Sequence, residues 1–400
     1  MSHFIVVGAG QAGSSLVVKL RDQGFDGKIT LIGDETSPPY QRPPLSKSYL
    51  LGELPRERLF LRPEAFYADR DITLRTGAAV TEIDPQGKTL RVGDETLGYD
   101  QLALTTGSLP RRLPDAIGGG LEGVHYVRTL TDVDKIEPEF RPGRHVLIVG
   151  GGYIGLEAAA VAAKQGLRVT LVEMADRILQ RVASPETSDY FRDLHTRHGV
   201  TIREGIGLSK LTGSPRVTGV QLSDGSKLEV DFVIAGTGIL PDTRLAEAAG
   251  IDCDNGIRTD QFGHTSFDRV WAAGDCASFP HGQSRLRLES VPNAIDMAET
   301  VAQNMLGLQK PYVPEPWFWS DQYDIKLQIA GLNMGYDKVA IRTTPDAQSH
   351  WYYKEDRLVA VDAMNDPRAF MVAKRLLVSG KSPDPGSVSD ANVELKTLLR

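Results

Sequence analysis

Two stretches of the chain share one hydrophobic pattern, in which a short apolar run is followed by a glycine-rich turn, an amphipathic segment and a second apolar run. The first is HFIVVGAGQAGSSLVVKLRDQGFDGKITLIGDE, residues 3–35. The second is RHVLIVGGGYIGLEAAAVAAKQGLRVTLVEMADR, residues 144–177. Apolar runs of this length predict buried strands, and the apolar spacing between them predicts a helix. Each stretch therefore predicts a β–α–β unit.

The glycines of both turns follow the spacing G-x-G-x-x-G. The first glycine of such a turn makes the tight bend, the second lets the backbone approach a pyrophosphate, and the third permits close packing of helix on strand. The start of the helix then points its free N–H groups at the phosphates. We predict two dinucleotide sites, with Gly8, Gly10 and Gly13 in the first turn and Gly150, Gly152 and Gly155 in the second.

The second site carries an acidic residue where the second strand ends. Glu173 follows Gly150 by 23 residues, the spacing at which a carboxylate accepts hydrogen bonds from the adenosine ribose. This favours NADH, because a 2′-phosphate would meet like charge. Arg177 and Arg181 would soften that repulsion, so some use of NADPH stays open. The alternative for Glu173 is a solvated carboxylate at a strand end.

The first site differs at the same position. Gly33 aligns with Glu173, and the acids that follow it are Asp34 and Glu35, one of which we expect to bind the ribose. Related but unequal sites indicate two different dinucleotides. We expect a permanently bound FAD in the first site and a diffusing nicotinamide dinucleotide in the second.

A late stretch, DRVWAAGDCASFP, predicts a further flavin contact. An apolar strand ends at Gly274 and Asp275, where a carboxylate can bind ribityl hydroxyls while backbone N–H groups face the pyrophosphate. The alternative is an ordinary aspartate in a turn. If Asp275 binds the flavin, this part of the chain returns to the first domain, and the flavin domain is discontinuous.

The pattern changes after about residue 314. The segments IKLQIAGL, YDKVAIRT and SHWYYKEDRLVAVDAM predict strands, with KEDR as a hairpin turn. The segment PRAFMVAKRLLVSGK predicts a helix that begins at Pro367 and ends at Gly380. We expect a small α+β domain here. Its tail, SPDPGSVSDANVELKTLLR, is expected to be poorly ordered up to a last helical turn.

Composition narrows the class of protein. A chain of 400 residues with 41% hydrophobic content predicts two or three domains. The net charge of −7 speaks against a general nucleic-acid or anionic-membrane binder. The first residues lack the charged and apolar regions of a secretory signal, and no apolar run has the length of a membrane span. We expect a cytoplasmic protein with no nucleic-acid or membrane partner.

Cysteine usage limits the redox chemistry. The chain contains only Cys253 and Cys276, which can neither supply four ligands to an iron–sulfur cluster nor form C-x-x-C. We therefore expect no metal site in the chain, and any iron–sulfur cluster belongs to a partner. Cys276 is interpreted as a small buried residue rather than a reactive thiol.

Several blocks, in this order, resemble the two-dinucleotide flavoprotein superfamily of glutathione reductase: VVGAGQAG, YDQLALTTGSLPR, VLIVGGGYIGLE, VIAGTGILPDT and VWAAGDCA. The blocks PPYQRPPLSKSYL, ESVPNAIDMAE and PWFWSDQYDIKLQIAGL narrow the resemblance to the ferredoxin reductases of bacterial oxygenase systems, the putidaredoxin reductase type. Unlike the disulfide reductases, this chain has no cysteine in the region 36–55, so direct dithiol chemistry is not expected.

The resemblance implies an α/β fold with two Rossmann-like dinucleotide-binding domains and a small C-terminal α+β domain. The expected division is a discontinuous FAD-binding domain at 1–112 and 244–314, an NAD-binding domain at 113–243 and the C-terminal domain at 315–400. The expected oligomeric state is a monomer or a weak dimer.

Three residues are expected nearest the chemistry. The resemblance implies that Lys47 and Glu157 form an ion pair beside the flavin ring, where a cation stabilises the reduced ring and a carboxylate balances that cation. It places Trp319 close to the flavin edge from which electrons leave. The alternatives are a surface lysine for Lys47, an acid that complements the helix dipole for Glu157 and a core aromatic residue for Trp319.

Other cofactor contacts follow from the resemblance. Arg42 and the neighbouring prolines are expected to form a rigid wall against the flavin nucleotide. Val291 opens a helix whose N-terminus would stabilise negative charge on the flavin pyrimidine; the alternative is a simple helix cap. The remaining expected cofactor contacts lie in the matching motifs and are Thr106, Gly107, Ile154 and Gly238.

The resulting hypothesis is an NADH-dependent ferredoxin reductase with bound FAD. It takes a hydride from NADH and passes single electrons to a [2Fe–2S] ferredoxin that serves an oxygenase, such as a cytochrome P450 or a ring-hydroxylating dioxygenase. Arg285, Arg287 and Lys326 are a candidate basic patch for an acidic ferredoxin, although ordinary solvated side chains are an equal alternative. Rubredoxin, quinone or oxygen as acceptor, or a signalling role like that of apoptosis-inducing factor, are the rival functions.

Overall fold

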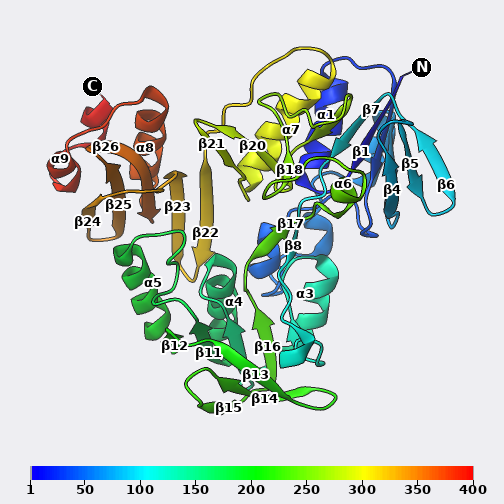
Figure 1. The fold of residues 1–400 in the computed structure, drawn as a ribbon. Helices are drawn as coiled ribbons and strands as arrows, with labels where there is room; N and C mark the ends of the chain where they lie inside the picture. Colours follow the sequence, from blue (N-terminus) through cyan, green and yellow to red (C-terminus); the bar gives the residue numbers. More distant parts are fainter. Residues whose placement is uncertain (1, 400) are drawn as a thin grey trace. The chain divides into compact units, whose positions relative to one another are not determined.

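The chain forms two compact units in a computed structural model that describes residues 2–399. Figure 1 shows the elements of both. Unit 1 combines residues 2–41, 56–109 and 239–316, so it is assembled from three separate chain segments. Unit 2 combines residues 42–55, 110–238 and 317–399.

Unit 1 is built on a parallel sheet of five strands. The strands bury both faces, and Ile5 and Val6 in the central strand are fully inaccessible to solvent, as expected for a parallel sheet covered on two sides. The predicted β–α–β unit is present as β1, α1 and β2. In spatial order the strands are β19 (Val270–Ala272), β7 (Gln101–Leu104), β1 (His3–Val7), β2 (Lys28–Ile32) and β3 (Ile72–Arg75).

Helices and smaller sheets complete unit 1. The helix α1 (Gln11–Asp22) packs against α7 (Val291–Met305), which comes from the last segment of the unit. The shorter helices are α2 (Glu64–Asp69) and α6 (Arg244–Ala248). The smaller strand sets are β4 (Val80–Asp84), β5 (Thr89–Val92) and β6 (Glu95–Gly98); β18 (Ile257–Arg258), β20 (Ala277–His281) and β21 (Ser284–Leu286); and β8 (Ser108–Pro110) with β17 (Ile239–Pro241).

Unit 2 contains a second parallel sheet of the same kind. Its predicted β–α–β unit is present as β10, α4 and β11, and α4 (Tyr153–Lys164) starts directly after the second glycine turn. In spatial order the strands are β12 (Thr201–Glu204), β11 (Arg168–Glu173), β10 (His145–Val149), β16 (Phe232–Ala235) and β9 (Val124–His125). The other elements of this half are α3 (Leu130–Ile136), α5 (Pro185–Arg197), β13 (Leu208–Gly213), β14 (Val217–Leu222) and β15 (Lys227–Glu229).

The C-terminal half of unit 2 is an antiparallel sheet covered by a helix. The predicted hairpin turn is present, since Glu355 and Asp356 both have positive φ, as a two-residue turn of type I′ requires. The predicted helix is α8 (Pro367–Ser379), and Gly380 ends it in the left-handed conformation. In spatial order the strands are β22 (Trp317–Gln322), β23 (Ile325–Gly331), β26 (Arg357–Met364), β25 (Ala347–Lys354) and β24 (Lys338–Thr344).

The C-terminal tail differs from the expectation of poor order. It forms α9 (Pro385–Ser389) and a short 3-10 helix over Leu395–Leu399. The guanidinium of Arg342, which is only 6% exposed, donates to the backbone carbonyls of Val388, Asp390, Ala391 and Val393. The expectation was wrong because a buried arginine on β24 needs acceptors, and the tail supplies them.

The segment 42–55 groups with unit 2, although the sequence places it in the first domain. It contains a 3-10 helix, Pro43–Ser46, and the Tyr49 hydroxyl donates to Asp134 in α3 at 2.7 Å. The two α/β sheets and the C-terminal α+β half confirm the predicted fold class. None of the helices within residues 2–399 combines the length and hydropathy that a bilayer crossing requires.

Candidate active site

The first glycine turn fits the three expected roles. Gly8 has a φ of +112°, and a Cβ there would lie 2.2 Å from the carbonyl oxygen of Thr105. A Cβ on Gly13 would lie 2.0 Å from the carbonyl oxygen of Gly8. A Cβ on Gly10 would meet no atom within 4 Å, so this position faces open space at the start of α1. Backbone that is closely packed at two glycines and open at the middle one can receive a phosphate.

Two further segments of unit 1 reach this turn. A Cβ on Gly274 would lie 2.9 Å from the Cβ of Ala12 in α1 and 3.9 Å from Ala294 in α7. Asp275 therefore stands beside the start of α1, and its carboxylate accepts a hydrogen bond from Ser108 at 3.0 Å. Val291 is the first residue of α7, whose first turn is capped by the Ser290 hydroxyl.

The loop after β7 borders the same turn, since Thr105 contacts Gly8. Thr106 donates its hydroxyl hydrogen to the carbonyl of Asp242 at 2.6 Å, and Gly107 has a φ of +71°. The structure thus brings together Gly8, Gly10, Gly13, Thr106, Gly107, Asp275 and Val291 from three chain segments of unit 1.

The candidate ribose acids of the first site differ in their surroundings. Asp34 is exposed, whereas the carboxylate of the half-buried Glu35 accepts a hydrogen bond from the Tyr40 hydroxyl at 2.6 Å. Arg42 belongs to unit 2, where its guanidinium donates to the carbonyl of Arg128 at 2.8 Å. The expectation that Arg42 contacts the flavin nucleotide stays a proposal.

The second glycine turn repeats the geometry of the first. Gly150 has a φ of +108°, and a Cβ there would lie 2.4 Å from the carbonyl oxygen of Gly236. A Cβ on Gly155 would lie 2.1 Å from the carbonyl oxygen of Gly150, while one on Gly152 would meet no atom within 4 Å. Ile154, 42% exposed, lies in the first turn of α4. Unit 2 therefore holds a second backbone that is open to phosphate.

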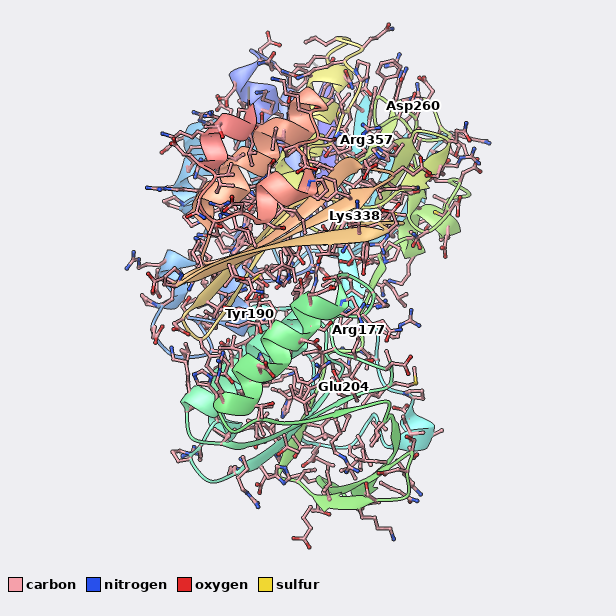
Figure 2. The ribbon with its side chains drawn as sticks, turned by 90° about the vertical axis from the view of Figure 1, so that its left-hand side faces the viewer. Arg177, Tyr190, Glu204, Asp260, Lys338 and Arg357 are labelled. Atoms are coloured by element: carbon pink, nitrogen blue, oxygen red, sulfur yellow. The ribbon has the colours of Figure 1, made fainter. Side chains whose placement is uncertain are left out.

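Glu173 is fixed toward this turn by two backbone donors. One carboxylate oxygen accepts from the N–H of Gly151 at 2.7 Å and the other from the N–H of Ala175 at 2.8 Å. The guanidinium of Arg177, labelled in Figure 2, donates to the carbonyls of Ala183 and Ser184. Because this guanidinium is hydrogen-bonded within the protein, it would offset the repulsion between Glu173 and a 2′-phosphate less than its place in the sequence suggests.

Arg181 and Gly238 lie close together near the second turn. The φ of Gly238 is +94°, and a Cβ on it would lie 3.6 Å from a guanidinium nitrogen of Arg181. The backbone N–H of Arg111 donates to the Gly238 carbonyl at 2.9 Å. Gly238 thus occupies the same place after β16 that Gly107 occupies after β7.

Lys47 and Glu157 form a largely buried ion pair. The Lys47 Nζ lies 2.8 Å from a Glu157 carboxylate oxygen, and the two side chains are 17% and 3% exposed. Two hydroxyls complete the carboxylate's surroundings, since Ser46 donates to Oε2 and Ser320 donates to Oε1, both at 2.6 Å. A carboxylate held by one cation and two donors is satisfied despite its burial.

Sequence reasoning did not identify Ser46 or Ser320. Ser46 precedes Lys47 directly, and Ser320 lies on β22 two residues before Gln322, on the same face of the strand. Two polar residues with this spacing in an aromatic-rich strand were the available signal. No motif revealed that this face of β22 would turn toward α4.

Trp319 lies on the opposite face of β22 from Ser320. Its ring stacks on Trp317 with centroids 5.6 Å apart, and Trp317 packs against Phe370 of α8. On the other face, Phe318 packs against Tyr153 of α4 at 5.0 Å. Trp319 is half-buried, and a contact with the flavin edge stays a proposal.

The candidate basic patch is partly used inside unit 1. Arg285 donates to Thr259 and Ser278, and Arg287, 11% exposed, forms an ion pair with Glu289 at 2.6 Å. Lys326, in unit 2, is exposed. The two arginines present little free charge, because their guanidinium groups already have partners, so the patch receives no support from their geometry.

The cysteines are placed where thiolates are disfavoured. Both thiols are free, and Cys276 is fully buried. Burial raises the pKa of Cys276, and it raises the pKa of Cys253 to about 11. The thiolate is the reactive form of cysteine, so neither residue is set up as a redox nucleophile.

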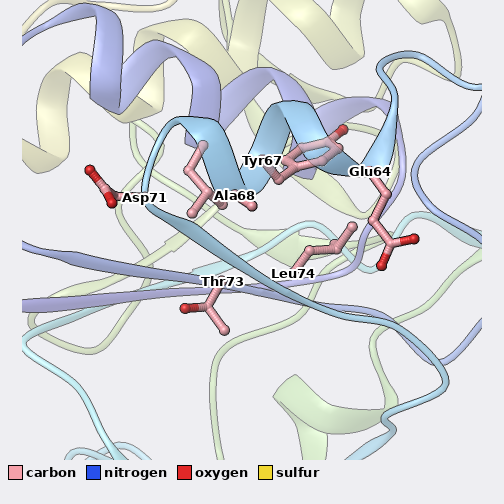
Figure 3. A pocket seen from close by; sticks show the side chains of 7 residues that line it. Glu64, Tyr67, Ala68, Asp71, Thr73 and Leu74 are labelled. Atoms are coloured by element: carbon pink, nitrogen blue, oxygen red, sulfur yellow. The ribbon is translucent and has the colours of Figure 1, made fainter.

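Neither a hollow in unit 1 nor a cluster of ligand side chains offers a competing site. The hollow in Figure 3 lies on α2 and the edge strand β3, and none of the predicted site residues lines it. In the described chain, no group of three or more His, Cys, Asp and Glu side chains has a geometry that would hold a metal ion. The glycine turns and the Lys47–Glu157 pair therefore remain the candidate site.

Comparison with protein families agrees with this geometry. Residues 2–298 match the family described as pyridine nucleotide-disulphide oxidoreductase, and residues 317–399 match the family described as reductase C-terminal. The chain belongs to the pyridine nucleotide-disulphide oxidoreductase family. This family binds FAD and uses NAD(P)H as substrate, so the chain is an FAD-dependent oxidoreductase.

Relatives within the family match over nearly the whole chain. A ferredoxin–NAD(P)(+) reductase of Sphingomonas sp is 42% identical over 403 residues, which cover 99% of this chain and 97% of the relative. Putidaredoxin reductase of Pseudomonas putida is 40% identical, over 99% of this chain and 96% of its own. The reductase in a crystal structure of the covalent putidaredoxin reductase–putidaredoxin complex aligns with a TM-score of 0.95 and 39% identity, covering 100% of this chain and 98% of the other.

Proposed function

We propose that this protein is an NADH-dependent ferredoxin reductase with bound FAD, and that it supplies electrons to an oxygenase such as a cytochrome P450 or a ring-hydroxylating dioxygenase. The observation that carries the proposal is the pair of unequal glycine turns. One lies among three chain segments of unit 1, and the other faces a fixed carboxylate, Glu173. A resident dinucleotide and an exchanging one require two such sites.

The proposed electron acceptor is a ferredoxin, because the chain has no reactive pair of thiols and because its relatives are named as ferredoxin reductases. The family carries the name of disulfide chemistry, but both thiols here are free and unsuited to it. The relatives described above are named reductases of ferredoxins, and one of them is known in a covalent complex with its ferredoxin. A [2Fe–2S] cluster accepts one electron at a time, whereas NADH delivers two together.

On this proposal, the two units bind different dinucleotides. When bound, FAD takes up the two electrons of one NADH and releases them singly. In unit 1, the turn at Gly10, the Asp275 carboxylate and the start of α7 hold it. In unit 2, the turn at Gly152 binds the NADH pyrophosphate and Glu173 binds its adenosine ribose.

The ion pair has an electrostatic role in the proposal. Lys47 presents a positive charge toward the reacting ring, and Glu157 fixes that ammonium group at 2.8 Å. Trp319 lies on the route by which electrons leave. These roles, like the division at residues 112, 243 and 314 between the domains, are part of the proposal.

A cytoplasmic location completes the proposal. It is supported by the two free thiols, as in compartments that keep cysteines reduced. Fractionation of cells that express the protein tests it, and recovery in the envelope or outside the cell would contradict it.

The function is tested by anaerobic stopped-flow mixing. The purified FAD-loaded protein is mixed with NADH while the flavin absorbance is followed, and the reduced protein is then mixed with a panel of [2Fe–2S] ferredoxins and rubredoxins. Fast bleaching by NADH and fast reoxidation by a [2Fe–2S] ferredoxin are expected. Reoxidation only by a quinone or oxygen would contradict the proposed acceptor, and slow bleaching by NADH would contradict the proposed donor.

A further inference from the structure

The Glu157 carboxylate is the end of a buried chain of hydrogen bonds in unit 2. Ser320 donates its hydroxyl hydrogen to Glu157 at 2.6 Å, and the amide nitrogen of Gln322 donates to the Ser320 oxygen at 3.1 Å. The amide oxygen of Gln322 lies 2.8 Å from Nε2 of His195 in α5. The Tyr323 hydroxyl lies 3.3 Å from Nδ1 of the same histidine. Ser320, Gln322 and His195 are fully inaccessible to solvent.

The direction of every hydrogen in this chain is determined. Burial lowers the pKa of His195 to about 4, so the ring is neutral near pH 7 and carries one hydrogen. Nε2 carries it, because its partner at 2.8 Å is the amide oxygen of Gln322, which can only accept. Nδ1 then accepts from the Tyr323 hydroxyl.

The same reasoning assigns the direction of the hydrogen bonds that Ser320 makes. The Ser320 oxygen receives a hydrogen from the Gln322 amide, so its own hydrogen is the one left to give. The Glu157 oxygen at 2.6 Å can only accept it, because an ionised carboxylate has no hydrogen. Hydrogen bonds that all donate in the same direction along a chain polarise one another. The last bond of this chain ends on the Glu157 carboxylate.

We propose that Ser320, Gln322 and His195 are positioning residues that aim a hydrogen at Oε1 of Glu157 and so hold this carboxylate turned toward Lys47. The inference rests on the proposed function, in which that ion pair stands beside the flavin. Ser46 donates to the other oxygen, Oε2, which also lies 2.8 Å from the Lys47 ammonium nitrogen. Removing the Ser320 hydroxyl would take away the hydrogen bond that the buried Oε1 atom accepts at 2.6 Å.

These hydrogen bonds also account for two of the three polar residues in the aromatic-rich strand β22. Ser320 and Gln322 lie on the face that meets α4 and α5, and Trp317 and Trp319 lie on the other. The C-terminal half of unit 2 thus contributes a donor to the ion pair rather than only packing beside it.

The test compares Ser320→Ala and Gln322→Leu with the matched variant Ser349→Ala. Ser349 is a fully buried serine of the same sheet, but its hydroxyl donates to Asp366 and it takes no part in the chain. Two readouts are used: the limiting rate of anaerobic flavin reduction by NADH across pH, and the midpoint potential of the bound flavin from a dithionite titration, which needs no NADH.

We expect Ser320→Ala to lower the limiting rate about tenfold, the usual cost of a lost hydrogen bond to a charged group. Gln322→Leu removes the hydrogen bond that orients the Ser320 hydroxyl, and it should lower the rate about threefold. Both variants should shift the midpoint potential, and Ser349→Ala should match the wild type in both readouts.

The two failures are distinguishable. If NADH does not reduce the wild type but Ser320→Ala still shifts the midpoint potential relative to Ser349→Ala, the positioning role stands and the proposed donor is wrong. If Ser320→Ala and Gln322→Leu both match Ser349→Ala in rate, pH profile and potential, the positioning role is overturned. A loss of thermal stability equal in Ser320→Ala and Ser349→Ala, with a slower rate in the first alone, supports it.

Discussion

The two glycine turns have the same backbone course but differ at two positions that face each other. In unit 1 the residue after the first glycine is Ala9, and the residue that directly follows the second strand is Gly33. In unit 2 the corresponding residues are Gly151 and Glu173. A Cβ on Gly33 would lie 2.5 Å from the Cβ of Ala9, so the space between the turn and the strand end admits one side chain.

This difference bears on the position of Glu173 beside the second turn. A Cβ on Gly151 would lie 2.6 Å from Cγ2 of Ile178 and 3.3 Å from the Cβ of Glu173, so the glycine leaves room for both side chains. The Glu173 carboxylate accepts the hydrogen of the Gly151 N–H at 2.7 Å. In unit 1 the alanine occupies that space, and the candidate acids Asp34 and Glu35 come one and two residues later. The glycine at position 151 thus leaves room beside the second turn for Glu173, the carboxylate proposed to bind the ribose.

The helices that follow the turns differ as well. Two residues beyond the third glycine, unit 1 has Ser15, whose hydroxyl accepts a hydrogen bond from Gln11 in the same helix. Unit 2 has Glu157 at this position, paired with Lys47. On the proposed function, the first turn holds a ligand, and the second turn is followed by the charged group of the proposed chemistry.

The largest expected effect comes from filling the open glycine of each turn. Neither Gly10→Ala nor Gly152→Ala creates a clash within the protein, because each Cβ would enter open space. Gly10→Ala should yield protein without FAD. Gly152→Ala should keep its FAD but be reduced by NADH about 100-fold more slowly, since a displaced substrate loses its alignment. Flavin absorbance of the purified protein and stopped-flow reduction measure both effects.

Gly98→Ala is the control for this pair. Its Cβ would lie 4.0 Å from the nearest atom, and Gly98 is distant in the sequence from both turns. It should leave flavin content and reduction unchanged. Flavin loss in Gly152→Ala with retention in Gly10→Ala would reverse the assignment of the two turns.

The next effect tests the residues two positions beyond each turn. Glu157→Ala should slow flavin reduction by about 10- to 100-fold, because it removes the partner of a largely buried lysine. Ser15→Ala, at the matching position of unit 1, should change the rate less than twofold, an upper bound for a lost weak hydrogen bond. Anaerobic stopped-flow rates compare the two, and equal rates for both variants would remove Glu157 from the chemistry.

A smaller effect concerns the choice of nicotinamide. Glu173→Gln removes the charge but keeps one acceptor oxygen, so kcat/KM for NADH should fall about tenfold. The preference for NADH over NADPH should shrink, because the like charge is gone. Steady-state rates with both donors measure this, and Glu229→Gln, an exposed strand-end residue of β15, is the control. Equal wild-type rates with NADH and NADPH would contradict the role of Glu173.

The smallest expected effect is a coupling between Ala9 and Gly33. Gly33→Ala alone should lower the free energy of unfolding by about 2 kcal/mol, because two Cβ atoms cannot approach to 2.5 Å. Adding Ala9→Gly should recover about 1 kcal/mol of this loss. Denaturant unfolding of the two single variants and the double variant measures the coupling. Strictly additive effects would show that the two positions do not compete for one space.

The sequence was sufficient for those features that local rules determine. The spacing of apolar residues and glycines gave both β–α–β units, and Pro367 and Gly380 gave the ends of α8. The turn KEDR was recognisable as a run of charged residues between two strand-like segments, and the positive φ values of Glu355 and Asp356 confirm it. The resemblance to a known family then placed Lys47 beside Glu157, 110 positions away in the chain.

Features that depend on tertiary partners were not predictable in this way. Nothing in the tail signals that it satisfies the buried Arg342, and nothing near Arg177 signals that its guanidinium turns inward. Likewise, Ser320 becomes important only because β22 lies against α4. In each case the decisive fact is where a distant polar group needs a partner.

The two faces of β22 have a consequence for recombination and engineering. Trp319 and Ser320 are adjacent in the sequence, yet one lies among the aromatic residues and the other touches Glu157. On the proposed function, a gene exchange that replaces the segment after residue 316 to obtain a new ferredoxin also replaces the hydroxyl beside the hydride-transfer site. On that proposal, chimaeras that exchange this segment should be screened for flavin reduction by NADH as well as for their electron acceptor.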